Sequence, residues 1–141
     1  ELVANPKIII PESVVVSISA DEPGRITSAN SIQENEAIFD IAPASFVDLE
    51  PIIMNAGTIL WNGPLGFFEK ENFFAGTAMI AEMIISSKGF SVAGGGDTIS
   101  AAEKAGVLDS LDYVSTAGGA FLEFMEGKKL PALEALIDKV N

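Results

Sequence analysis

The residues best suited to chemistry lie in the segment FSVAGGGDT, residues 90–98. A short apolar run ends there in three consecutive glycines, followed by Asp97, Thr98 and an alanine-rich helical pattern. We interpret this order as a buried strand, a tight turn and the start of a helix. Glycines let a ligand approach the backbone closely, and N–H groups at a helix N-terminus suit an anion such as a phosphate. A plain strand-to-helix turn with Asp97 as its N-cap explains the segment about equally well.

The amino-acid composition narrows the chemistry that any site could use. The 141 residues include no cysteine and no histidine, which excludes disulfides, zinc sites built on thiolates or imidazoles, and serine-type catalytic triads. Catalysis would have to use carboxylates, lysine, backbone dipoles or a hard metal ion. With 20 acidic and 8 basic residues the net charge is −12, so we expect neither nucleic acid nor an anionic membrane as a partner.

The length of the chain and its 48% hydrophobic content are typical of a globular domain with a sizeable core. No apolar run is long enough for a membrane span, and the first residues, ELVANPKIII, do not resemble a signal peptide. We therefore predict one domain over residues 1–141 and a cytoplasmic location.

Hydrophobic patterning predicts the elements that must position the glycine-rich segment. The predicted strands are residues 7–10, 14–18 (buried on both faces), 25–27, 58–61, 90–93 and 113–115, and residues 37–41 form an apolar run that Pro43 breaks. The predicted helices are residues 46–55 with Ser45 as N-cap, 73–87, 99–105, 121–126, and a last amphipathic helix from Pro131 with Leu133, Leu136, Ile137 and Val140 facing inward.

From residue 58 onward strands and helices alternate. This order predicts an α/β fold, a mostly parallel, Rossmann-like sheet with helices on both faces in three αβα layers. Glycine-rich turns follow the strands that end at Trp61, Ala93 and Ser115. The carboxyl ends of parallel strands share one edge, where ligands bind. Three such turns on one edge could build a continuous rim that accepts anions.

Taken in order, several segments resemble the C-terminal, nucleotide-binding domain of phosphoglycerate kinase. The matching segments are WNGPLGFFE (61–69), FAGT (74–77), GGGDT (94–98), EKAG (103–106) and STAGGAFLEFMEGKKLPAL (115–133), with weaker matches at IIIPESVVVS (8–17) and DIAPAS (40–45). The family transfers a phosphoryl group reversibly between 1,3-bisphosphoglycerate and Mg-ADP in glycolysis. The resemblance covers nearly the whole chain and implies a partial C-terminal domain of this kinase, with ADP or ATP and Mg²⁺ as its ligands.

The resemblance also implies roles for single residues. In the first turn, Asn62 with Gly63 and Pro64 would shape the pocket near the nucleotide phosphates. Phe67 would line the adenine and ribose pocket, and Glu69 would accept hydrogen bonds from the ribose hydroxyls. Considered singly, Phe67 could equally be a core or rim residue, as could Trp61, and Glu69 could be a solvated surface acid.

The second and third turns match the family at the phosphates. Asp97 would hold the nucleotide-bound Mg²⁺, since magnesium prefers carboxylate oxygens. Thr98 would contact a phosphate, and Gly95 and Gly96 would let the loop pack close to the ligand. The loop whose backbone N–H groups face the transferring phosphoryl group is matched by Ser115, Thr116, Gly118 and Gly119, the last two being the catalytic candidates.

Parts of the family pattern are absent. The resemblance places the phosphoglycerate site on an N-terminal domain that this chain does not contain. None of the 8 cations lies inside a glycine-rich turn, although phosphoryl transfer needs cations around the phosphates. Ala117 stands where the family usually has a third glycine. We hypothesise that the isolated chain is not a competent kinase.

Two further expectations concern assembly. The alternative to a nucleotide-binding part of an enzyme is a non-catalytic binding or assembly module that retains the fold. A parallel sheet without its first strands should also expose an edge with unpaired N–H and C=O groups. This edge predicts a homodimer through the sheet or a rearranged segment that covers it.

Overall fold

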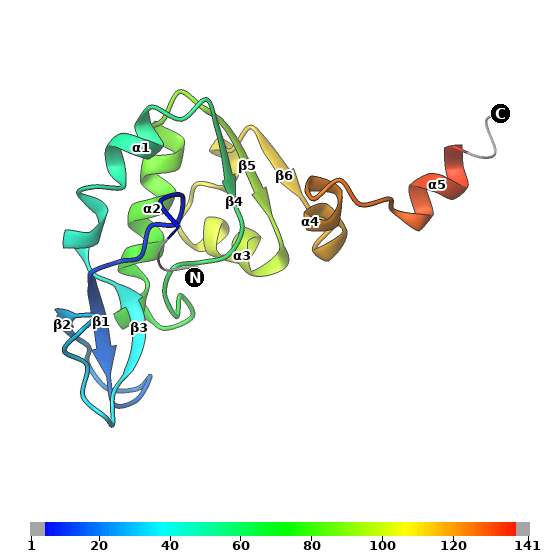
Figure 1. The fold of residues 1–141 in the computed structure, drawn as a ribbon. Coiled ribbons are helices and arrows are strands. Elements are labelled where there is room, and N and C mark those ends of the chain that lie inside the picture. The colour runs from blue at the N-terminus through cyan, green and yellow to red at the C-terminus, as the bar shows by residue number, and fades with distance from the viewer. Residues whose placement is uncertain (1–4, 138–141) are drawn as a thin grey trace.

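A computed structural model describes residues 5–137 of the chain. Its strands are β1 (Ser13–Ser17), β2 (Arg25–Ser28), β3 (Ala37–Ile41), β4 (Thr58–Trp61), β5 (Phe90–Gly94) and β6 (Tyr113–Ser115). Its α-helices are α1 (Glu50–Met54), α2 (Ala75–Ser86), α3 (Gly96–Lys104), α4 (Gly119–Met125) and α5 (Pro131–Ile137). Short 3-10 helices are η2 (Pro43–Phe46), η3 (Glu71–Phe73) and η4 (Leu108–Ser110). The strands form two sheets: the antiparallel sheet lies at the N-terminal end of α2, and the parallel sheet lies beside α2 (Figure 1).

The first sheet is antiparallel, with β1 between β2 and β3. Val14 of β1 lies opposite Ile41 of β3, and Val16 lies opposite Ile38, with a register shift between them. The side chains of Val14 and Val16 are buried, whereas Val15 is half-buried. Ser17, on the same face as Val15, is also buried, so the second face is covered in part. The predicted strand extends one residue too far, because Ile18 lies beyond β1 and is 62% exposed.

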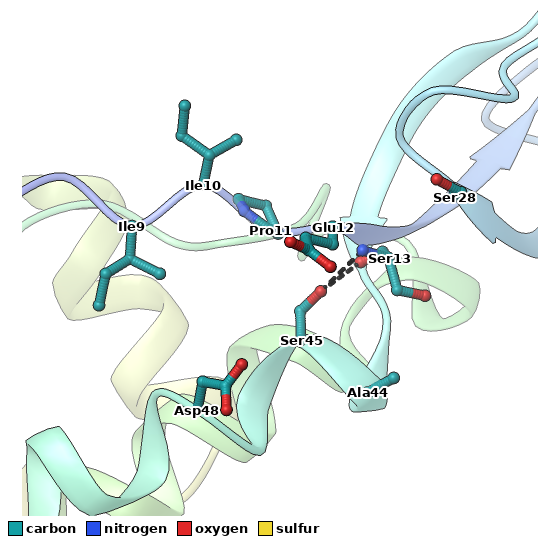
Figure 2. Close-up of a pocket in the computed structure, with 9 residues that line it drawn as sticks. All are labelled: Ile9, Ile10, Pro11, Glu12, Ser13, Ser28, Ala44, Ser45 and Asp48. Carbon is teal, nitrogen blue, oxygen red and sulfur yellow. Dashed lines mark hydrogen bonds between the residues drawn. The ribbon is translucent and has the colours of Figure 1, made fainter. Parts of the chain in front are cut away.

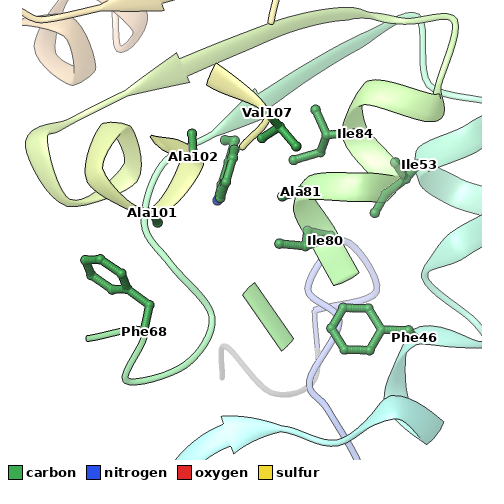
Figure 3. Close-up of a cluster of buried hydrophobic side chains, with 10 residues drawn as sticks. Phe46, Ile53, Phe68, Ile80, Ala81, Ile84, Ala101, Ala102 and Val107 are labelled. Carbon is green, nitrogen blue, oxygen red and sulfur yellow. The ribbon is translucent and has the colours of Figure 1, made fainter. Parts of the chain in front are cut away.

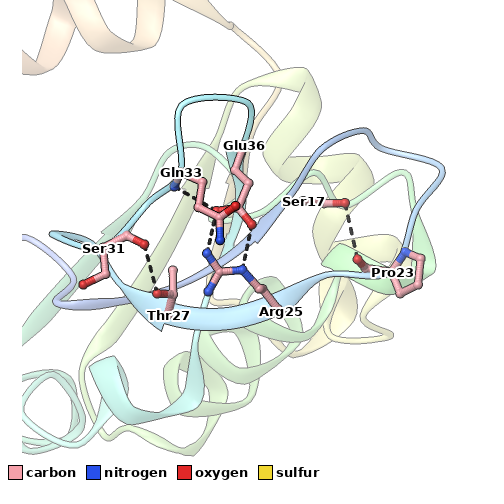
Figure 4. A network of polar contacts seen from close by, with 7 residues as sticks. All are labelled: Ser17, Pro23, Arg25, Thr27, Ser31, Gln33 and Glu36. Carbon is pink, nitrogen blue, oxygen red and sulfur yellow. Dashed lines mark hydrogen bonds and ion pairs between the residues drawn. The ribbon is translucent and has the colours of Figure 1, made fainter.

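Polar side chains hold the loops of this antiparallel sheet (Figure 4). Arg25 donates two hydrogen bonds to the Glu36 carboxylate, both of 2.6 Å. The N–H of Gln33 donates to the same carboxylate at 2.9 Å. The bonds from Arg25 first, and then the bond from Gln33, lower the pKa of Glu36. The connection between β2 and β3, which lie on either side of β1, is thus held by a two-pronged ion pair.

The predicted strand over residues 7–10 is wrong. These residues are irregular, and Ile8, Ile9 and Ile10 are each 40–50% exposed. Ile9, Ile10 and Pro11 line a hollow of about 450 Å³ (Figure 2). Strand propensity is overridden here because no neighbouring strand within the described residues pairs with this segment.

The helix predicted over residues 46–55 is also wrong in its extent. The structure has η2 and then the short helix α1, in which Pro51 occupies the first turn. Proline lacks the N–H that a helix interior needs, so α1 begins just before it. Ser45 is not an N-cap, because its hydroxyl donates to the Ser13 carbonyl at 2.8 Å and accepts from the Ser13 N–H at 2.9 Å (Figure 2).

The second sheet is parallel, in the order β4-β5-β6, and confirms the predicted α/β class. Trp61 of β4 lies opposite Ala93 of β5, and Gly94 lies opposite Ser115 of β6. The three strands therefore end at the same edge. The alternation of strands and helices that the sequence predicts after residue 58 is present as β4-α2-β5-α3-β6.

The main core lies where α2 and α3 pack on one face of this sheet (Figure 3). Its buried members are Phe46, Ile53, Trp61, Phe68, Ile80, Ala81, Ile84, Ala101, Ala102 and Val107. The small alanines of α3 allow this helix to approach the strands closely. On the other face Leu60, Phe90 and Tyr113 are 41%, 52% and 54% exposed. That face carries apolar side chains that the described helices leave largely uncovered.

The last helix departs from its prediction. α5 projects away from the rest of the molecule (Figure 1). Leu133, Leu136 and Ile137 are 44%, 63% and 59% exposed, so the prediction that they face inward is wrong. Val140 lies outside the described residues. Amphipathic spacing identifies the apolar face of a helix, but it does not supply a surface for that face to bury. No helix within residues 5–137 is long and apolar enough to cross a membrane.

Candidate active site

The turns after β4 and β5 are joined by hydrogen bonds at the carboxyl edge of the parallel sheet. The Asn62 side-chain amide donates to the Gly94 carbonyl at 2.6 Å. The Gly63 N–H donates to Thr98 Oγ1 at 2.7 Å. The predicted convergence of these two turns is therefore present in the structure. Because the contacts join residues more than 30 positions apart, they depend on the parallel pairing of β4 with β5.

The second turn presents the first N–H groups of α3 to solvent. Gly95 has φ +94°, a conformation that side-chain-bearing residues rarely adopt, and α3 starts at the next residue. Gly96 and Asp97 are exposed. Within the described residues no hydrogen bond uses the N–H of Gly96 or Asp97. Free N–H groups at the positive end of a helix dipole form a place where an anion can bind.

The N-cap interpretation of Asp97 is wrong. Gly95 occupies the cap position, and no side chain caps α3. Asp97 lies in the first turn with its side chain exposed. Thr98 is 1% exposed, and its oxygen accepts the Gly63 N–H. The structure thus leaves the Asp97 carboxylate accessible and uses the Thr98 hydroxyl to fasten two turns together.

The third turn follows β6. Ser115 is buried, and its hydroxyl accepts the N–H of Ala117 at 3.4 Å. Gly118 has φ +53°, and a Cβ built on Gly118 or Gly119 would meet open space. Thr116 is exposed. The backbone of this turn is therefore open to a ligand, with a glycine conformation at its centre.

Ala117 is not among the residues that line the hollow beside Asn62 and Gly63. It is exposed and lines a separate hollow of about 570 Å³ with Tyr113, Phe121 and Phe124. The Phe121 ring also packs over the end of β5, where a Cβ on Gly94 would lie 2.5 Å from the ring. A side chain at position 94 would therefore have to displace the Phe121 ring.

The segment after β4 separates core from rim. Trp61 is 5% exposed and belongs to the core, and its indole N–H donates to the Gly63 carbonyl at 2.9 Å. Phe67 is 38% exposed, with its ring 6.2 Å from that of Phe39. Glu69 is exposed. Of the alternatives left open by the sequence, Trp61 is therefore core and Phe67 is rim.

Comparison with known proteins identifies the family. A family model described as phosphoglycerate kinase matches residues 2–128. The chain belongs to the phosphoglycerate kinase family. The structure of phosphoglycerate kinase from Coxiella burnetii is similar, with 43% identity and a TM-score of 0.83 over 89% of this chain and 33% of that chain. The phosphoglycerate kinase from Pyrococcus horikoshii OT3 is similar at 35% identity and a TM-score of 0.77, over 89% of this chain and 31% of that chain.

The coverage values show which part of a family protein the chain matches. It corresponds to part of the C-terminal domain of a phosphoglycerate kinase. It spans about a third of the length of the two solved kinases. The resemblance given by the sequence motifs is therefore confirmed.

Three side chains of this phosphoglycerate kinase domain have no role in the motif analysis but hold the site in shape. Thr77 of α2 accepts two backbone N–H groups of the segment after β4. Lys104 of α3 donates to the Phe68 carbonyl at 2.6 Å. Asp40 of β3 is 1% exposed and accepts the Gly76 N–H at 2.8 Å. The sequence motifs that contain these residues, FAGT, EKAG and DIAPAS, can be recognised from the sequence. In these contacts, the backbone groups that the three side chains bind lie 11 to 36 positions away and cannot be recognised from it.

Asp40 has the most unusual electrostatic environment of these three. Burial raises the pKa of its carboxyl, while hydrogen bonds from Gly76 and Ile41 act in the opposite direction. Both oxygens are used, because the Ile41 N–H donates to Oδ1 at 2.8 Å and the Gly76 N–H donates to Oδ2. The carboxylate thereby binds β3 to the first turn of α2.

Among residues 5–137 no group of three or more acidic side chains is placed to hold a metal ion. Asp97 is the accessible carboxylate beside the open first turn of α3. Mg²⁺ commonly binds through one or two carboxylates together with substrate phosphates and water. A single aspartate next to free backbone N–H groups therefore fits an Mg²⁺ ion that would arrive with a nucleotide.

Proposed function

We propose that this chain is the Mg-nucleotide-binding part of a phosphoglycerate kinase. The observation that supports this most is the joining of the Asn62–Gly63 turn to the Gly94–Thr98 turn beside free N–H groups of α3. In open parallel sheets, ligands bind at the carboxyl ends of the strands. The glycine backbone there can approach a polyphosphate without steric hindrance.

The nucleotide phosphates would lie over the first turn of α3. Gly95 and Gly96 offer the backbone, and Asp97 would hold Mg²⁺ against the phosphate oxygens. Asn62, with Gly63 and Pro64, would form the neighbouring wall. Mg²⁺ would neutralise charge on the phosphates, which is the main electrostatic requirement of phosphoryl transfer. Thr98 would support this wall through Gly63 rather than through an exposed side chain.

The remaining predicted residues would contact either the adenosine end of the nucleotide or its terminal phosphate. Phe67 and Glu69 are exposed on the segment after β4, where Glu69 would accept hydrogen bonds from ribose hydroxyls. The backbone around Gly118 and Gly119, with Ser115 and Thr116, would face the transferring phosphoryl group. The open space beside Gly118 and Gly119 supports this assignment.

The positions of three cationic side chains support a role in nucleotide binding without catalysis. Arg25 pairs with Glu36, Lys70 pairs with Asp21, and Lys104 binds a backbone carbonyl. The Arg25 and Lys70 pairs lie away from the glycine-rich turns, and Lys104 binds the Phe68 carbonyl beyond the glycines of the first turn. We infer that the phosphoglycerate site and the cationic clamp come from the remainder of a family-length enzyme. The isolated chain would bind a nucleotide without turning over substrate, in the cytoplasm and in the service of glycolysis.

Calorimetric titration with Mg-ADP tests this function. We expect binding by the chain and clear weakening in Asp97→Ala, because the Mg²⁺ ligand is removed. Asp109→Ala is the matched control, since Asp109 is an exposed aspartate in the first turn of another helix, η4. No heat at millimolar Mg-ADP would contradict the proposal, as would equal weakening by both variants.

A second candidate function is an assembly module without chemistry. The exposed side chains of Leu60, Phe90 and Tyr113 favour it, because parallel sheets normally have both faces covered. Within the described residues β4 pairs only with β5, so its outer edge is also free. A second copy of the chain could pair with this edge and form a homodimer. The two functions differ in whether Mg-ADP binds.

A further inference from the structure

Residues 62–69, which lie between β4 and η3, have no regular secondary structure. We call this segment the 62–69 loop. It contains Asn62 at the phosphate end and Glu69 at the other end. Despite its irregular backbone, it is fastened to side chains of α2 and α3, elements that follow it in the chain. An irregular loop held in this way loses little entropy when a ligand binds.

The middle of the loop is held by Thr77. This residue is fully buried, with 0% of its surface exposed, in the first turn of α2. Its hydroxyl oxygen accepts the N–H groups of Leu65 and Gly66, each at 3.2 Å. Without that oxygen, two backbone donors would lose their partner in a half-buried place. One side chain therefore fixes two successive residues of the loop.

Gly66 is confined from the other side by Asp40. A Cβ at position 66 would overlap the Asp40 carboxylate and the Phe73 carbonyl. The next residue, Phe67, donates its N–H to the Phe39 carbonyl at 2.7 Å. The loop thus passes through a narrow space between β3 and α2. Its path there is set by contacts rather than by its own sequence.

The far end of the loop is held by Lys104. Its Nζ donates to the Phe68 carbonyl at 2.6 Å and lies 4.5 Å from the centre of the Phe74 ring. It also lies 3.5 Å from the Glu71 carboxylate. Lys104 is the last residue of α3, whose first turn carries Asp97. A helix of nine residues is about 13 Å long, so α3 spaces the two ends of the site.

We propose that Thr77 and Lys104 are positioning residues of the nucleotide site. They hold the 62–69 loop so that Phe67 and Glu69 face outward at a constant distance from Asp97. Neither residue touches the proposed nucleotide, and each acts through the backbone that it binds. The inference rests on the proposed function for its consequence, but the anchoring itself can be measured without any nucleotide.

The test on Thr77 uses three variants. Thr77→Val preserves the shape and removes the oxygen, Thr77→Ser retains the oxygen, and Thr27→Val is the matched control. The Thr27 hydroxyl also bonds to a backbone group, the Ser31 carbonyl, but in the antiparallel sheet (Figure 4). We measure amide hydrogen exchange by NMR, the Mg-ADP dissociation constant by calorimetry, and global stability by urea unfolding.

We expect Thr77→Val to accelerate amide exchange at Leu65 and Gly66 beyond any change in global stability. We also expect it to weaken Mg-ADP binding about tenfold, as the loss of buried hydrogen bonds would. Thr77→Ser should restore both quantities, and Thr27→Val should change neither. Rescue by serine separates positioning from a general packing effect, because serine has the oxygen without the methyl group.

The test on Lys104 follows the same design. Lys104→Met retains the aliphatic stem and removes the donor to the Phe68 carbonyl. We expect altered chemical shifts at Phe67–Glu69 and weaker Mg-ADP binding. Lys129→Met is the control, because Lys129 pairs with Glu134 on the surface of α5. This control removes one positive charge, as Lys104→Met does, without touching the loop.

The two proposals fail in different ways. If the wild-type chain does not bind Mg-ADP, the proposed function is wrong, and amide exchange at Leu65 and Gly66 still decides the anchoring. If exchange at these amides is unchanged in Thr77→Val, the positioning role is overturned. It is equally overturned if the wild-type chain binds Mg-ADP and Thr77→Val binds it as tightly.

Discussion

Replacement of Asp40 by asparagine should destabilise the fold, although it removes a buried charge. Each oxygen of the Asp40 carboxylate accepts one backbone N–H, from Ile41 and from Gly76, at 2.8 Å. An asparagine side chain has one oxygen and one NH₂ group. In either orientation the NH₂ group would face an N–H donor, so one backbone group would be left without an acceptor.

The size of the effect follows from two opposing terms. A buried donor that loses its partner costs about 1–3 kcal/mol. Against this, burial raises the pKa of the Asp40 carboxyl, which shows that the fold disfavours its charged form. A neutral amide avoids that cost. Since the carboxylate makes two charge-assisted hydrogen bonds, we expect the lost bond to prevail, with a net loss of about 1–2 kcal/mol.

Urea unfolding followed by the fluorescence of Trp61, the one tryptophan of the chain, measures this loss. Trp61 is 5% exposed, so unfolding should change its emission. Asp48→Asn is the control, because it removes an exposed aspartate from the same part of the chain. A transition midpoint for Asp40→Asn at or above that of the wild type would refute the reasoning.

The pH dependence of the same comparison has a definite sign. The folded pKa of Asp40 lies above the ordinary value of 3.8. Between the two values the folded state binds more protons than the unfolded state, so stability falls as the pH rises through this window. The advantage of the wild type over Asp40→Asn should therefore grow as the pH is lowered from neutral toward 3.8. A difference that shrinks would contradict the assignment.

Three further outcomes are expected. Gly66→Ala should destabilise by about 1–3 kcal/mol because its Cβ would overlap the Asp40 carboxylate and the Phe73 carbonyl; Gly57→Ala, where a Cβ meets nothing within 4 Å, should be near neutral in the same urea assay. Arg25 lowers the pKa of Glu36 from 4.5, so the stability that this ion pair contributes is lost as the pH falls below 4.5. In urea unfolding across acidic pH, Arg25→Gln should therefore lose less stability than the wild type does. Sedimentation velocity should detect a dimer that Leu60→Lys weakens, because the β4 edge and the apolar face at Leu60 are open; a wild-type monomer at high concentration would contradict self-pairing.

Local patterns predicted the parallel half of the molecule well. The strands at residues 58–61, 90–93 and 113–115 are present within a residue at each end. Their turns meet at one edge because consecutive βα units run parallel with a consistent hand. Such features depend on residues close together in the sequence, where periodicity and glycine positions carry the information.

The errors share one physical cause. Ser45 was predicted to cap a helix, but it bonds to Ser13 of β1. Asp97 was predicted to cap α3, but Gly95 takes that position. The apolar face of α5 was predicted to be buried, but it is exposed. In each case the residue types and their spacing indicated what a side chain could do, namely cap a helix or become buried. Which partner it contacts depends on the residues that the tertiary structure places next to it.

Local sequence patterns were enough to indicate the family, the positions of the parallel strands along the chain and the glycine-rich turns. Tertiary structure decided which side chains hold those turns in place. Asp40 reaches Gly76, and Lys104 reaches Phe68, each across 36 positions of the chain. Hydrogen bonds form between neighbours in space, and neighbours in space are created only when the sheets and helices have packed. Residue types can therefore predict the rim of the site, whereas its support becomes visible only in the folded molecule.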